Sequence, residues 1–482
     1  MKIKTLFVSA EMAPLAQSGG LGDVVGALPS RLKAQGHDVR VVLPLYKKIK
    51  QKYEKKLKFL RWSMIKLGWR TMYSGLLSMK LDGVTIYFID NDFYFGHDPL
   101  YIDYSFDIER FSFFQRAVLE ALGEPMDFEP DILHLHDWQT AMIPCLLDAH
   151  YRPYGYHQKV RTLLTIHNLK YQGIHGRERI ADLMDLPDRY MSEFGVLKDG
   201  VPNFMKAGIV YADRVNTVSP NYAAEIMTAY YGEGLEVLLQ SQAYKLSGIL
   251  NGIDEISYNP ASDESIARCY DLKTWKEGKA ACKNALQKEL GLEQTGHQPL
   301  AVMISRLVDQ KGLDLLLRIL DEMLHSGIQV AVLGTGEPYY EQALREIAAR
   351  NPRRLAVRIL FDIDLSRRLY AGGDLFLMPS LFEPCGLSQM IAMRYGTLPV
   401  VRETGGLKDT VIPFNPETNE GNGFSFANIN AHELLFKVQD AANTYRERPQ
   451  EWQKLVESAM KGDYSWNRSA RDYLDLYRML IG

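Results

Sequence analysis

The sequence repeats one pattern: a short run of apolar residues followed by a segment with helical spacing. Each run has about 5–7 residues rich in Val, Ile, Leu and Phe. Continuous apolar runs predict strands buried on both faces, as in parallel sheets covered by helices. Their alternation with helices predicts βαβ units. The runs are 5–10, 39–44, 84–90, 131–136, 162–167, 214–219, 300–305, 329–334, 355–361, 374–379 and 398–402.

The apolar runs fall into two sets, separated by a weak boundary near residues 250–260. Turn signals mark this boundary at Asn251-Gly252 and at Asn259-Pro260. The sequence therefore predicts an α/β protein with two Rossmann-like, doubly wound parallel-sheet domains that face a cleft. Ligands of such sheets bind at the carboxyl ends of the strands. Motifs that directly follow a predicted strand are thus the candidates for a functional site.

Composition and charge exclude several other classes of protein. The chain has 482 residues, of which 46% are apolar and 24% are charged, which is typical of a folded globular protein. The formal net charge of −3 gives no general attraction to nucleic acid or to an anionic membrane. We interpret the basic segment 47–58 as a solvated helix face. No apolar run approaches the roughly 18 residues that span a bilayer.

Cysteine usage and the first residues indicate a reduced, cytoplasmic protein. The four cysteines are too few for a disulfide framework, and no two have the C-x-x-C spacing of a zinc or thioredoxin-like site. The apolar stretch 5–10 is too short for a signal peptide, and Glu11 follows it at once. The sequence shows no self-complementary patch from which to predict an oligomeric state.

A glycine-rich turn follows the first predicted strand. The turn at 16–23 (Ala-Gln-Ser-Gly-Gly-Leu-Gly-Asp, with Gly20) leads into a helix that we expect to begin near Asp23. Glycines let the backbone approach a ligand closely, and the N–H groups of a helix N-terminus suit a phosphate. A tight turn without a ligand is the alternative interpretation. A similar turn at 404–407 (Thr-Gly-Gly-Leu) follows the last predicted strand, which favours one ligand that contacts both turns.

Two cations bracket a strand-to-helix turn in the second half of the chain. Arg306 ends a predicted strand and Lys311 lies just before a helix. Cations at this spacing can bind a diphosphate from two sides and would stabilise it as a leaving group. A surface ion-pair cluster is the alternative interpretation.

A carboxylate follows another predicted strand. Glu383 lies between the run 374–379 and a glycine-containing turn, where it can accept hydrogen bonds from sugar hydroxyls or balance positive charge on a sugar ring. The alternative is a glutamate that interacts with a helix dipole. Cys385 has no histidine near it in the sequence, so we interpret it as a packed thiol.

Histidines lie at the ends of two further strands. The motif His134-Leu-His136-Asp137 contains residue types that ligate metals. However, the two histidines share one face of the strand while Asp137 has the other, and no further cluster completes a metal site. We interpret the motif as a polar wall of the cleft. His167 can position a sugar hydroxyl or assist proton transfer, or it is a satisfied core histidine.

Taken together, these motifs resemble the bacterial glycogen synthases and the related plant starch synthases. The resemblance covers nearly the whole chain, and the order and spacing of the motifs carry it. The matching segments are LFVSAE at 6–11, SGGL at 18–21, HDW at 136–138, TIHNL at 165–169, ADRVNTVSP at 212–220, GILNGID at 248–254, SRL at 305–307, QKGLD at 310–314, FEPCGLSQ at 382–389 and YSW at 464–466.

The resemblance implies a fold and a reaction. It implies two Rossmann-like domains in the GT-B arrangement, at 1–250 and 251–455, and a C-terminal helix at 456–482 that crosses back to the first domain. It implies transfer of glucose from ADP-glucose to the non-reducing end of an α-1,4-glucan, with retention at the anomeric carbon. It also implies that the reaction needs no metal ion and no other cofactor.

The resemblance further implies roles for individual residues. Arg306 and Lys311 hold the diphosphate, and backbone N–H groups of the 404–407 turn add donors to it. Independently of the resemblance, Tyr101 lies in the aromatic segment 93–114, where a ring suits the apolar face of a sugar although core packing explains most of the aromatic residues. The catalytic residues are Glu383, His167 and Asp137; the donor-binding residues are Gln17, Gly20, Asn251, Arg306, Lys311, Cys385, Gly386, Leu387, Thr404, Gly405 and Gly406; the acceptor side holds Tyr101, Asp137 and His167.

One residue departs from the family pattern, because Gln17 stands where the family has a lysine. A charge-assisted hydrogen bond contributes about 1.5–3 kcal/mol and a neutral one about 0.5–1.5 kcal/mol, so we expect roughly tenfold weaker donor binding. Two other functions stay open. One is another GT-B glucosyltransferase, such as a sucrose-synthase-like enzyme or a glucan phosphorylase. The other is a catalytically weak glucan-binding paralogue, against which Glu383, Arg306 and Lys311 argue.

Overall fold

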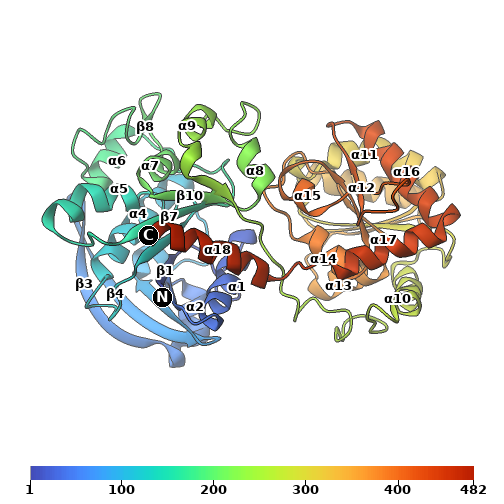
Figure 1. Cartoon of the computed structure of the whole chain (residues 1–482), viewed down its shortest axis with the longest axis horizontal. Coiled ribbons are helices and arrows are strands. Elements are labelled where there is room, and N and C mark those ends of the chain that lie inside the picture. The colour runs from blue at the N-terminus through green and yellow to red at the C-terminus, as the bar shows by residue number, and fades with distance from the viewer. Residues whose placement is uncertain (1) are drawn as a thin grey trace. The chain divides into compact units, whose positions relative to one another are not determined.

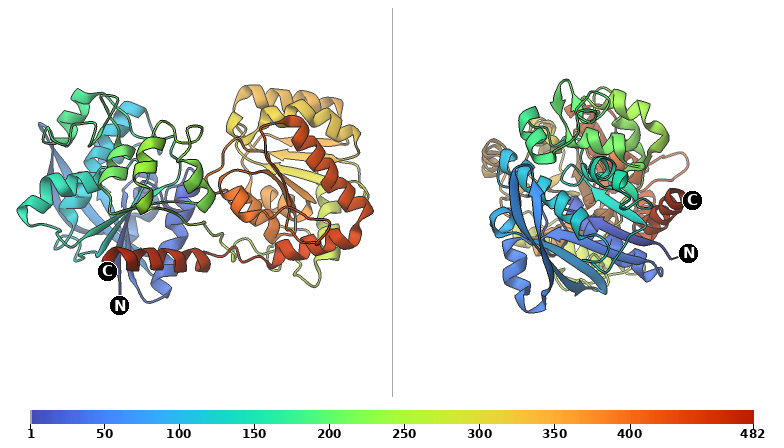
Figure 2. Two further views of the ribbon diagram at one scale, coloured as in Figure 1. Left: turned by 45° about the horizontal axis from the view of Figure 1, so that its top comes forward. Right: turned by 90° about the vertical axis from the view of Figure 1, so that its left-hand side faces the viewer.

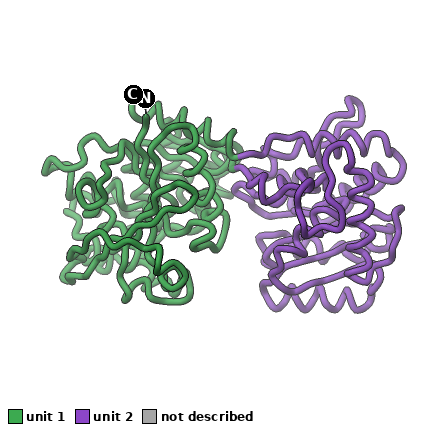
Figure 3. Tube along the Cα trace, turned by 90° about the horizontal axis from the view of Figure 1, so that it is seen from below, with its two compact units in different colours: residues 1–251, 466–482 green, residues 252–465 purple. Residues whose placement is uncertain are grey.

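The computed structural model describes residues 2–482, which form two compact units (Figures 1 and 3). Among the described residues, unit 1 comprises 2–251 and 466–482, and unit 2 comprises 252–465. Each unit is built on a largely parallel sheet, as the sequence predicts. No helix within residues 2–482 combines the length and the apolar character that crossing a bilayer requires.

The sheet of unit 1 has nine strands in the order β11-β10-β7-β6-β1-β2-β5-β4-β3. Neighbours from β11 to β5 are parallel, whereas β4 pairs antiparallel with both β5 and β3. The strands are β1 (Lys4–Val8), β2 (Asp38–Pro44), β3 (Lys58–Leu67), β4 (Arg70–Leu81), β5 (Val84–Asp90), β6 (Ile132–His136), β7 (Arg161–Ile166), β10 (Arg214–Thr217) and β11 (Leu246–Gly248), with a separate hairpin of β8 (Leu197–Lys198) and β9 (Val201–Pro202).

The six apolar runs predicted in the first half correspond to β1, β2, β5, β6, β7 and β10. The sequence does not predict the other three strands of this sheet, which are β3, β4 and the short β11. In β3, Ile65 and Leu67 are buried while Trp62 and Met64 are more than half exposed. Such a one-sided strand at the edge of a sheet has alternating burial and no continuous apolar run.

Helices pack on both faces of the unit 1 sheet (Figure 2). Helix α4 is buried along most of its length, and its Arg110 is fully buried in an ion pair with Asp107. The helices are α1 (Gly20–Ala34), α2 (Lys47–Tyr53), α3 (Asp92–Phe95), α4 (Tyr104–Ala121), α5 (Ile143–Leu146), α6 (Arg177–Met184), α7 (Phe204–Tyr211), α8 (Pro220–Glu225), α9 (Glu236–Ser241) and α18 (Trp466–Ile481).

The sheet of unit 2 has six parallel strands in the order β14-β13-β12-β15-β16-β17. All five runs predicted in the second half are strands of this sheet, and only the short β17 was not expected. The strands are β12 (Leu300–Ile304), β13 (Gln329–Leu333), β14 (Leu355–Arg358), β15 (Leu375–Met378), β16 (Leu398–Arg402) and β17 (Phe424–Phe426). The helices are α10 (Trp275–Leu290), α11 (Leu313–His325), α12 (Pro338–Arg350), α13 (Ile363–Gly372), α14 (Ser388–Arg394), α15 (Gly405–Thr410), α16 (Ala431–Glu447) and α17 (Pro449–Lys461).

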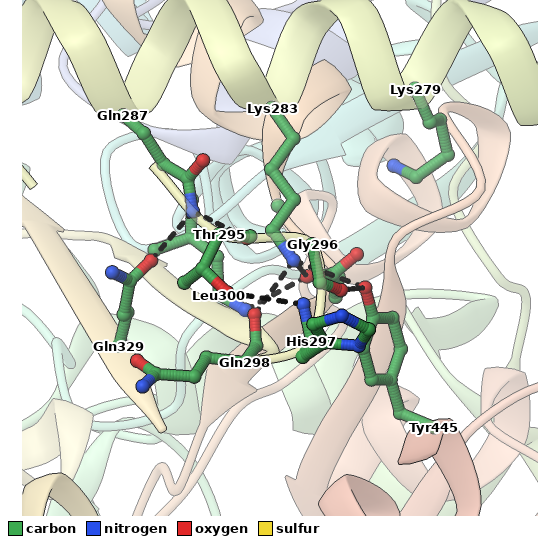
Figure 4. A network of polar contacts seen from close by, with 12 residues as sticks. Lys279, Lys283, Gln287, Thr295, Gly296, His297, Gln298, Leu300, Gln329 and Tyr445 are labelled. Atoms are coloured by element: carbon green, nitrogen blue, oxygen red, sulfur yellow. Dashed lines mark hydrogen bonds and ion pairs between the residues drawn. The ribbon is translucent and has the colours of Figure 1, made fainter. Parts of the chain in front are cut away.

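A buried ion pair ties α10 to the amino edge of this sheet. Lys283 Nζ lies 2.6 Å from an Asp374 carboxylate oxygen, which also accepts the Leu300 N–H. The same ammonium donates to the Gln298 carbonyl and the Tyr445 hydroxyl (Figure 4). These contacts fix the starts of β12 and β15, whose opposite ends carry predicted site residues. A pocket of about 710 Å³ also opens at the amino edge, and no predicted site residue lines it.

The chain passes between the units at 251/252 and at 465/466. The expected boundary at 455/456 falls inside α17, whose Val456 and Met460 pack on Gly396 of unit 2. Unit 2 therefore continues beyond that point, and the helix expected from 456 begins at Trp466. The two passages are adjacent within unit 2, because the Ile253 N–H donates to the Tyr464 carbonyl over 2.8 Å.

Candidate active site

The carboxyl edge of the unit 2 sheet gathers those predicted donor-binding residues that belong to unit 2, whereas Gln17, Gly20 and Asn251 belong to unit 1. Strands β12, β15 and β16 are neighbours in this sheet. The segments that follow them carry Arg306, Glu383 and Thr404 in turn. Because neighbouring parallel strands end at the same edge, residues far apart in the sequence are brought together there.

An ion pair between Lys311 and Glu383 lies at this edge. Lys311 Nζ is 2.6 Å from Glu383 Oε2, and the side chains are only 16% and 11% exposed. The Ser380 hydroxyl donates to the same carboxylate oxygen over 3.1 Å. The sequence predicts both residues for the site, but it does not predict that they bind each other. Arg306 is exposed and makes no ion pair with any residue in 2–482, so its guanidinium is available to an anion.

Glycines allow the loops at this edge to touch. Gly312, which follows Lys311, has φ of +71°, and a Cβ there would lie 2.0 Å from the Pro379 carbonyl oxygen. A Cβ on Gly405 (φ +44°) would lie 2.0 Å from the Glu383 carbonyl oxygen. The Gly406 N–H donates to the Glu383 and Pro384 carbonyls. This N–H is thus shared between two carbonyls within the protein, and its predicted donation to a diphosphate stays a prediction.

The turn after Glu383 is a packed loop. Cys385 is buried, and Gly386 has φ of +72°. Gln389 Nε2 donates to the carbonyls of both residues. Leu387 immediately precedes α14. The burial of the thiol agrees with its interpretation as a packed group.

Sequence reasoning missed an exposed aromatic residue at the same edge. Phe361 follows the edge strand β14, and its side chain is 86% exposed. A flat, exposed ring suits stacking on a planar base. The sequence could have indicated Phe361 by its position, because it is the last residue of the apolar run 355–361. The strand itself ends earlier than this run, at Arg358.

The carboxyl edge of the unit 1 sheet holds the predicted catalytic residues Asp137 and His167. Asp137 has φ of +55°, which is uncommon for a residue other than glycine. Its Oδ1 accepts the backbone N–H of His167 over 2.7 Å and that of Asn168 over 3.4 Å. Burial raises the pKa of Asp137 to about 7, and the nearby Glu11 adds to this rise. Asp137 therefore holds the His167 loop and titrates near neutrality.

Glu11 is a buried carboxylate that sequence reasoning did not select. It accepts the Ser18 N–H over 2.6 Å, the Ser18 hydroxyl over 2.7 Å and the Tyr101 hydroxyl over 2.7 Å. Glu11 thus holds the glycine-rich turn and orients Tyr101, which the sequence predicts on the acceptor side. The sequence could have indicated Glu11 as a candidate site residue, because it follows a predicted buried strand as Glu383 does.

Gln17 makes a short-range contact in the structure. Its Nε2 donates to Asp23 Oδ1 over 2.8 Å. Burial raises the pKa of Asp23 to about 6, although the Gln17 hydrogen bond opposes this. Gly20 begins α1, is exposed, and has open space where a side chain would project. The turn therefore leaves room for a ligand beside the N-terminus of α1.

His134 and His136 do lie on one face of β6, with ring centroids 4.3 Å apart. Both are fully buried, so the predicted polar wall of a cleft is wrong for these two rings. Phe7 of β1 packs on both of them, and Tyr473 of α18 packs on His134. No group of three or more His, Cys, Asp or Glu side chains in residues 2–482 is arranged to hold a metal ion.

Asn251 is buried, and its Oδ1 has no partner among residues 2–482.

We expect Asp137→Asn to stabilise the protein more as the pH rises. Its pKa is raised from 3.8 to about 7 in the fold, so between these values the folded chain binds a proton that the unfolded chain has released. Wild-type stability therefore falls through this window. Asparagine keeps the Oδ1 acceptor, tolerates positive φ and has no charge to bury. The variant should gain about 1–4 kcal/mol at pH 8 relative to wild type, measured by urea unfolding at several pH values.

Asp82→Asn is the matched control. Asp82 also has positive φ (+48°) but is exposed. Asp82→Asn therefore shows how asparagine at a positive φ changes stability when no buried carboxylate is removed. An Asp137→Asn gain that is the same at pH 5 and pH 8 would contradict the assigned pKa shift.

Comparisons with known proteins cover both halves of the chain. A family model described as the starch synthase catalytic domain matches residues 4–241, and one described as glycosyl transferases group 1 matches residues 288–457. The chain is 48% identical to a glycogen synthase of Exiguobacterium sibiricum, with 99% of each chain covered. It is also 48% identical to that of Geobacillus stearothermophilus, over 99% of this chain and 98% of the relative.

Solved structures extend the comparison to the fold. The catalytic domain of Starch Synthase IV from Arabidopsis thaliana, bound to ADP and acarbose, matches with a TM-score of 0.91 at 34% identity, over 100% of both chains. Sucrose-phosphate synthase from Thermosynechococcus elongatus matches with a TM-score of 0.59 at 17% identity, over 99% of this chain and 98% of the other; this likeness shows the fold alone.

The predicted GT-B fold and the predicted family are confirmed. The two family models match the two halves of the chain in turn, and the identity to the relatives extends over almost every residue. The chain belongs to the glycogen synthase family of glucosyltransferases.

Proposed function

We propose that this protein transfers glucose from ADP-glucose to the non-reducing end of an α-1,4-glucan, with retention at the anomeric carbon and without a metal ion. The observation that carries the proposal is the Lys311–Glu383 pair at the carboxyl edge of the unit 2 sheet, the edge at which the exposed cation Arg306 follows β12. The solved relative bound to ADP and acarbose supports the nucleotide and the glucan. A cytoplasmic location, as expected from the sequence, is part of the proposal.

The donor side of the reaction belongs to unit 2. Arg306 and Lys311 bind the diphosphate and stabilise the charge that grows on it as it leaves. Lys311 then exchanges part of its contact with Glu383 for the phosphate oxygens. Glu383 stays beside the sugar, where its negative charge balances an oxocarbenium-like transition state. The positive φ of Gly312 and Gly405 holds the two loops close enough for these contacts.

The acceptor side belongs to unit 1. Asp137 holds the backbone of His167, and Glu11 holds Tyr101 and the glycine-rich turn. The acceptor 4-hydroxyl attacks from the face that the leaving group departs from, and a phosphate oxygen takes its proton. This same-face route gives retention without a second carboxylate as nucleophile.

A catalytically weak glucan-binding protein is the second candidate. The neutral Gln17, bonded to Asp23, favours it. The intact Lys311–Glu383 pair argues against it.

The deciding experiment measures nucleotide release from ADP-glucose and from UDP-glucose, each with glycogen and with EDTA present. We expect ADP release and glucan extension that EDTA does not change. Glycogen binding with neither nucleotide released would favour the second candidate. Release of UDP alone would refute ADP-glucose as the donor, and loss of activity in EDTA would refute the metal-free mechanism.

Gln17→Lys is expected to tighten ADP-glucose binding about tenfold, because a charged donor replaces a neutral one near the diphosphate. The measurement is the dissociation constant by isothermal titration calorimetry. Asp23 lies 2.8 Å from the present amide and can capture the new ammonium. The double variant with Asp23→Asn therefore tests the same gain without this competitor.

Gln17→Met is the control for side-chain length without a donor, and it should not tighten binding. If neither the lysine variant nor the double variant binds ADP-glucose more tightly, Gln17 does not contact the donor.

A further inference from the structure

A chain of buried polar side chains crosses the unit 1 sheet beneath α18. Asn216 Nδ2 lies 3.2 Å from the Tyr473 hydroxyl and 3.4 Å from the Thr217 carbonyl. Asn216 Oδ1 faces the Thr165 hydroxyl. A carbonyl can only accept a hydrogen bond, so the Thr217 contact fixes which end of the amide is the donor. The Thr165 hydroxyl must therefore donate to Asn216.

This direction fixes the protons on His134. The Thr165 hydroxyl has one proton, which Asn216 receives, so its oxygen accepts from His134 Nε2 over 2.6 Å. A neutral His134 then has no proton on Nδ1, which accepts from the Tyr477 hydroxyl over 2.7 Å. His134 is thus satisfied at both nitrogens by structural partners, and it has no capacity left for a substrate.

His136 differs from His134, because it has a partner at only one nitrogen. Its Nδ1 lies 3.0 Å from His167 Nε2. Its Nε2 is buried and has no partner among residues 2–482. Burial lowers the pKa of His136 well below its ordinary value and lowers that of His167 to about 3. Both rings are neutral at physiological pH, so one donates and the other accepts.

The unpartnered nitrogen decides between the two arrangements. If His167 donated, His136 would carry its proton on Nε2 and bury an N–H without an acceptor. If His136 donates, its buried Nε2 is only an unused lone pair. Buried N–H groups without a partner are rarer in proteins than unused acceptors. The proton therefore lies on His136 Nδ1 and is donated to His167 Nε2.

The consequence falls on the other nitrogen of His167. With Nε2 accepting, the single proton of the neutral ring lies on Nδ1. His167 Nδ1 has no hydrogen-bond partner among residues 2–482 and is not one of the fully enclosed polar atoms. The accessible nitrogen of this catalytic residue is therefore an N–H group.

We propose that His136 is a positioning residue that holds His167 as the neutral Nδ1–H tautomer, so that His167 offers the substrate a hydrogen-bond donor. Such a ring can donate to an oxygen acceptor, such as a sugar hydroxyl, but it cannot take a proton at its accessible nitrogen. This decides between the two roles predicted for His167 in favour of positioning. The sugar as the acceptor rests on the proposed function, whereas the tautomer does not.

The direct test is a long-range proton–nitrogen correlation spectrum of the full chain with nitrogen-15-labelled histidine, at neutral pH and without substrate. Protonated and unprotonated imidazole nitrogens have well-separated shifts. The His167→Gln variant identifies the signals of His167 by their loss. We expect His167 to be protonated at Nδ1 and not at Nε2. A neutral ring protonated at Nε2, or a charged ring, would overturn the proposal.

Two variants of His136 test its role as the donor. Asparagine places its Nδ2 where the histidine has Nδ1, whereas leucine places no donor there. We expect His136→Leu to lower kcat/KM at least about tenfold and His136→Asn to stay within about threefold of wild type. The His167 signals should keep the Nδ1–H pattern in the asparagine variant. Equal impairment of both variants, or an Nε2–H pattern in the asparagine variant, would refute the donor role.

The wild-type spectrum tests the tautomer assignment even if the His136→Leu variant does not fold. It also separates this proposal from the proposed function. An Nδ1–H tautomer in a protein that releases no ADP from ADP-glucose would refute the function and leave the tautomer assignment intact.

Discussion

Glu383→Ala is expected to lower kcat at least about a hundredfold while unit 2 stays folded, because electrostatic stabilisation of developing charge contributes this much in other enzymes. In the fold, the carboxylate is held by Lys311 and by the Ser380 hydroxyl. In the proposed mechanism, alanine removes the negative charge beside the sugar and leaves Arg306 and Lys311, the proposed diphosphate ligands, in place. Turnover is measured as ADP release with saturating ADP-glucose and glycogen, and the fold by circular dichroism.

Two controls accompany this variant. Glu383→Gln keeps the side-chain volume and loses only the charge, so it should lose nearly as much activity. Glu457→Ala removes the carboxylate of an exposed ion pair with Lys461 in the same unit and should change nothing. Near-normal turnover in either Glu383 variant would refute the electrostatic role of this residue.

Lys311→Ala is expected to lower kcat/KM for ADP-glucose at least about a thousandfold, because the change removes both the cation proposed to bind the diphosphate and the partner of Glu383. Binding of ADP distinguishes the two roles. ADP has the diphosphate but no glucose, so Lys311→Ala should weaken ADP binding at least about tenfold. Glu383→Ala should leave ADP binding within about twofold of wild type. Both dissociation constants are measured by calorimetry.

Lys461→Ala is the matched control, since it removes the cation of the exposed pair with Glu457. The assignment of Lys311 to the diphosphate would be wrong if its alanine variant bound ADP as tightly as wild type does.

The parallel strands could be predicted because they are buried on both faces. The runs 300–305 and 398–402 read as strands without any context, and the structure has strands there. The hairpin of β3 and β4 could not be predicted in this way. Trp62 and Met64 face solvent although their side chains are apolar. The alternation of apolar and polar residues that would indicate a one-sided strand is therefore lost.

For the site, the sequence predicts which residues follow the strand ends, but not which of these residues contact each other. Strand order brings Lys311 and Glu383 to one edge, but their 2.6 Å contact depends on Gly312, whose positive φ lets its loop approach Pro379. Glu11 and Tyr101 meet through a hydrogen bond across 90 residues. Such pairings follow from backbone geometry that is set by the whole fold, and no local pattern in the sequence encodes them.

The expected domain boundary at 455/456 is wrong for a related reason. The segment 449–461 has the amphipathic spacing of a surface helix, and this spacing does not tell which sheet the helix covers. Trp452, Leu455 and Val456 are buried in unit 2. Only their packing assigns α17 to that unit and leaves α18 as the helix of unit 1.

Helix α18 completes the core of unit 1, yet it follows all of unit 2 in the sequence. A ribosome extends the chain from its N-terminus, and domains fold as they emerge. Residues 1–251 therefore leave the ribosome before Tyr473 and Tyr477 exist, and His134 has no tyrosine partner during that time. Unit 2 is synthesised in full while unit 1 waits for its last helix. A messenger RNA that ends before the codon for Trp466 thus encodes a complete second unit and an unfinished first one.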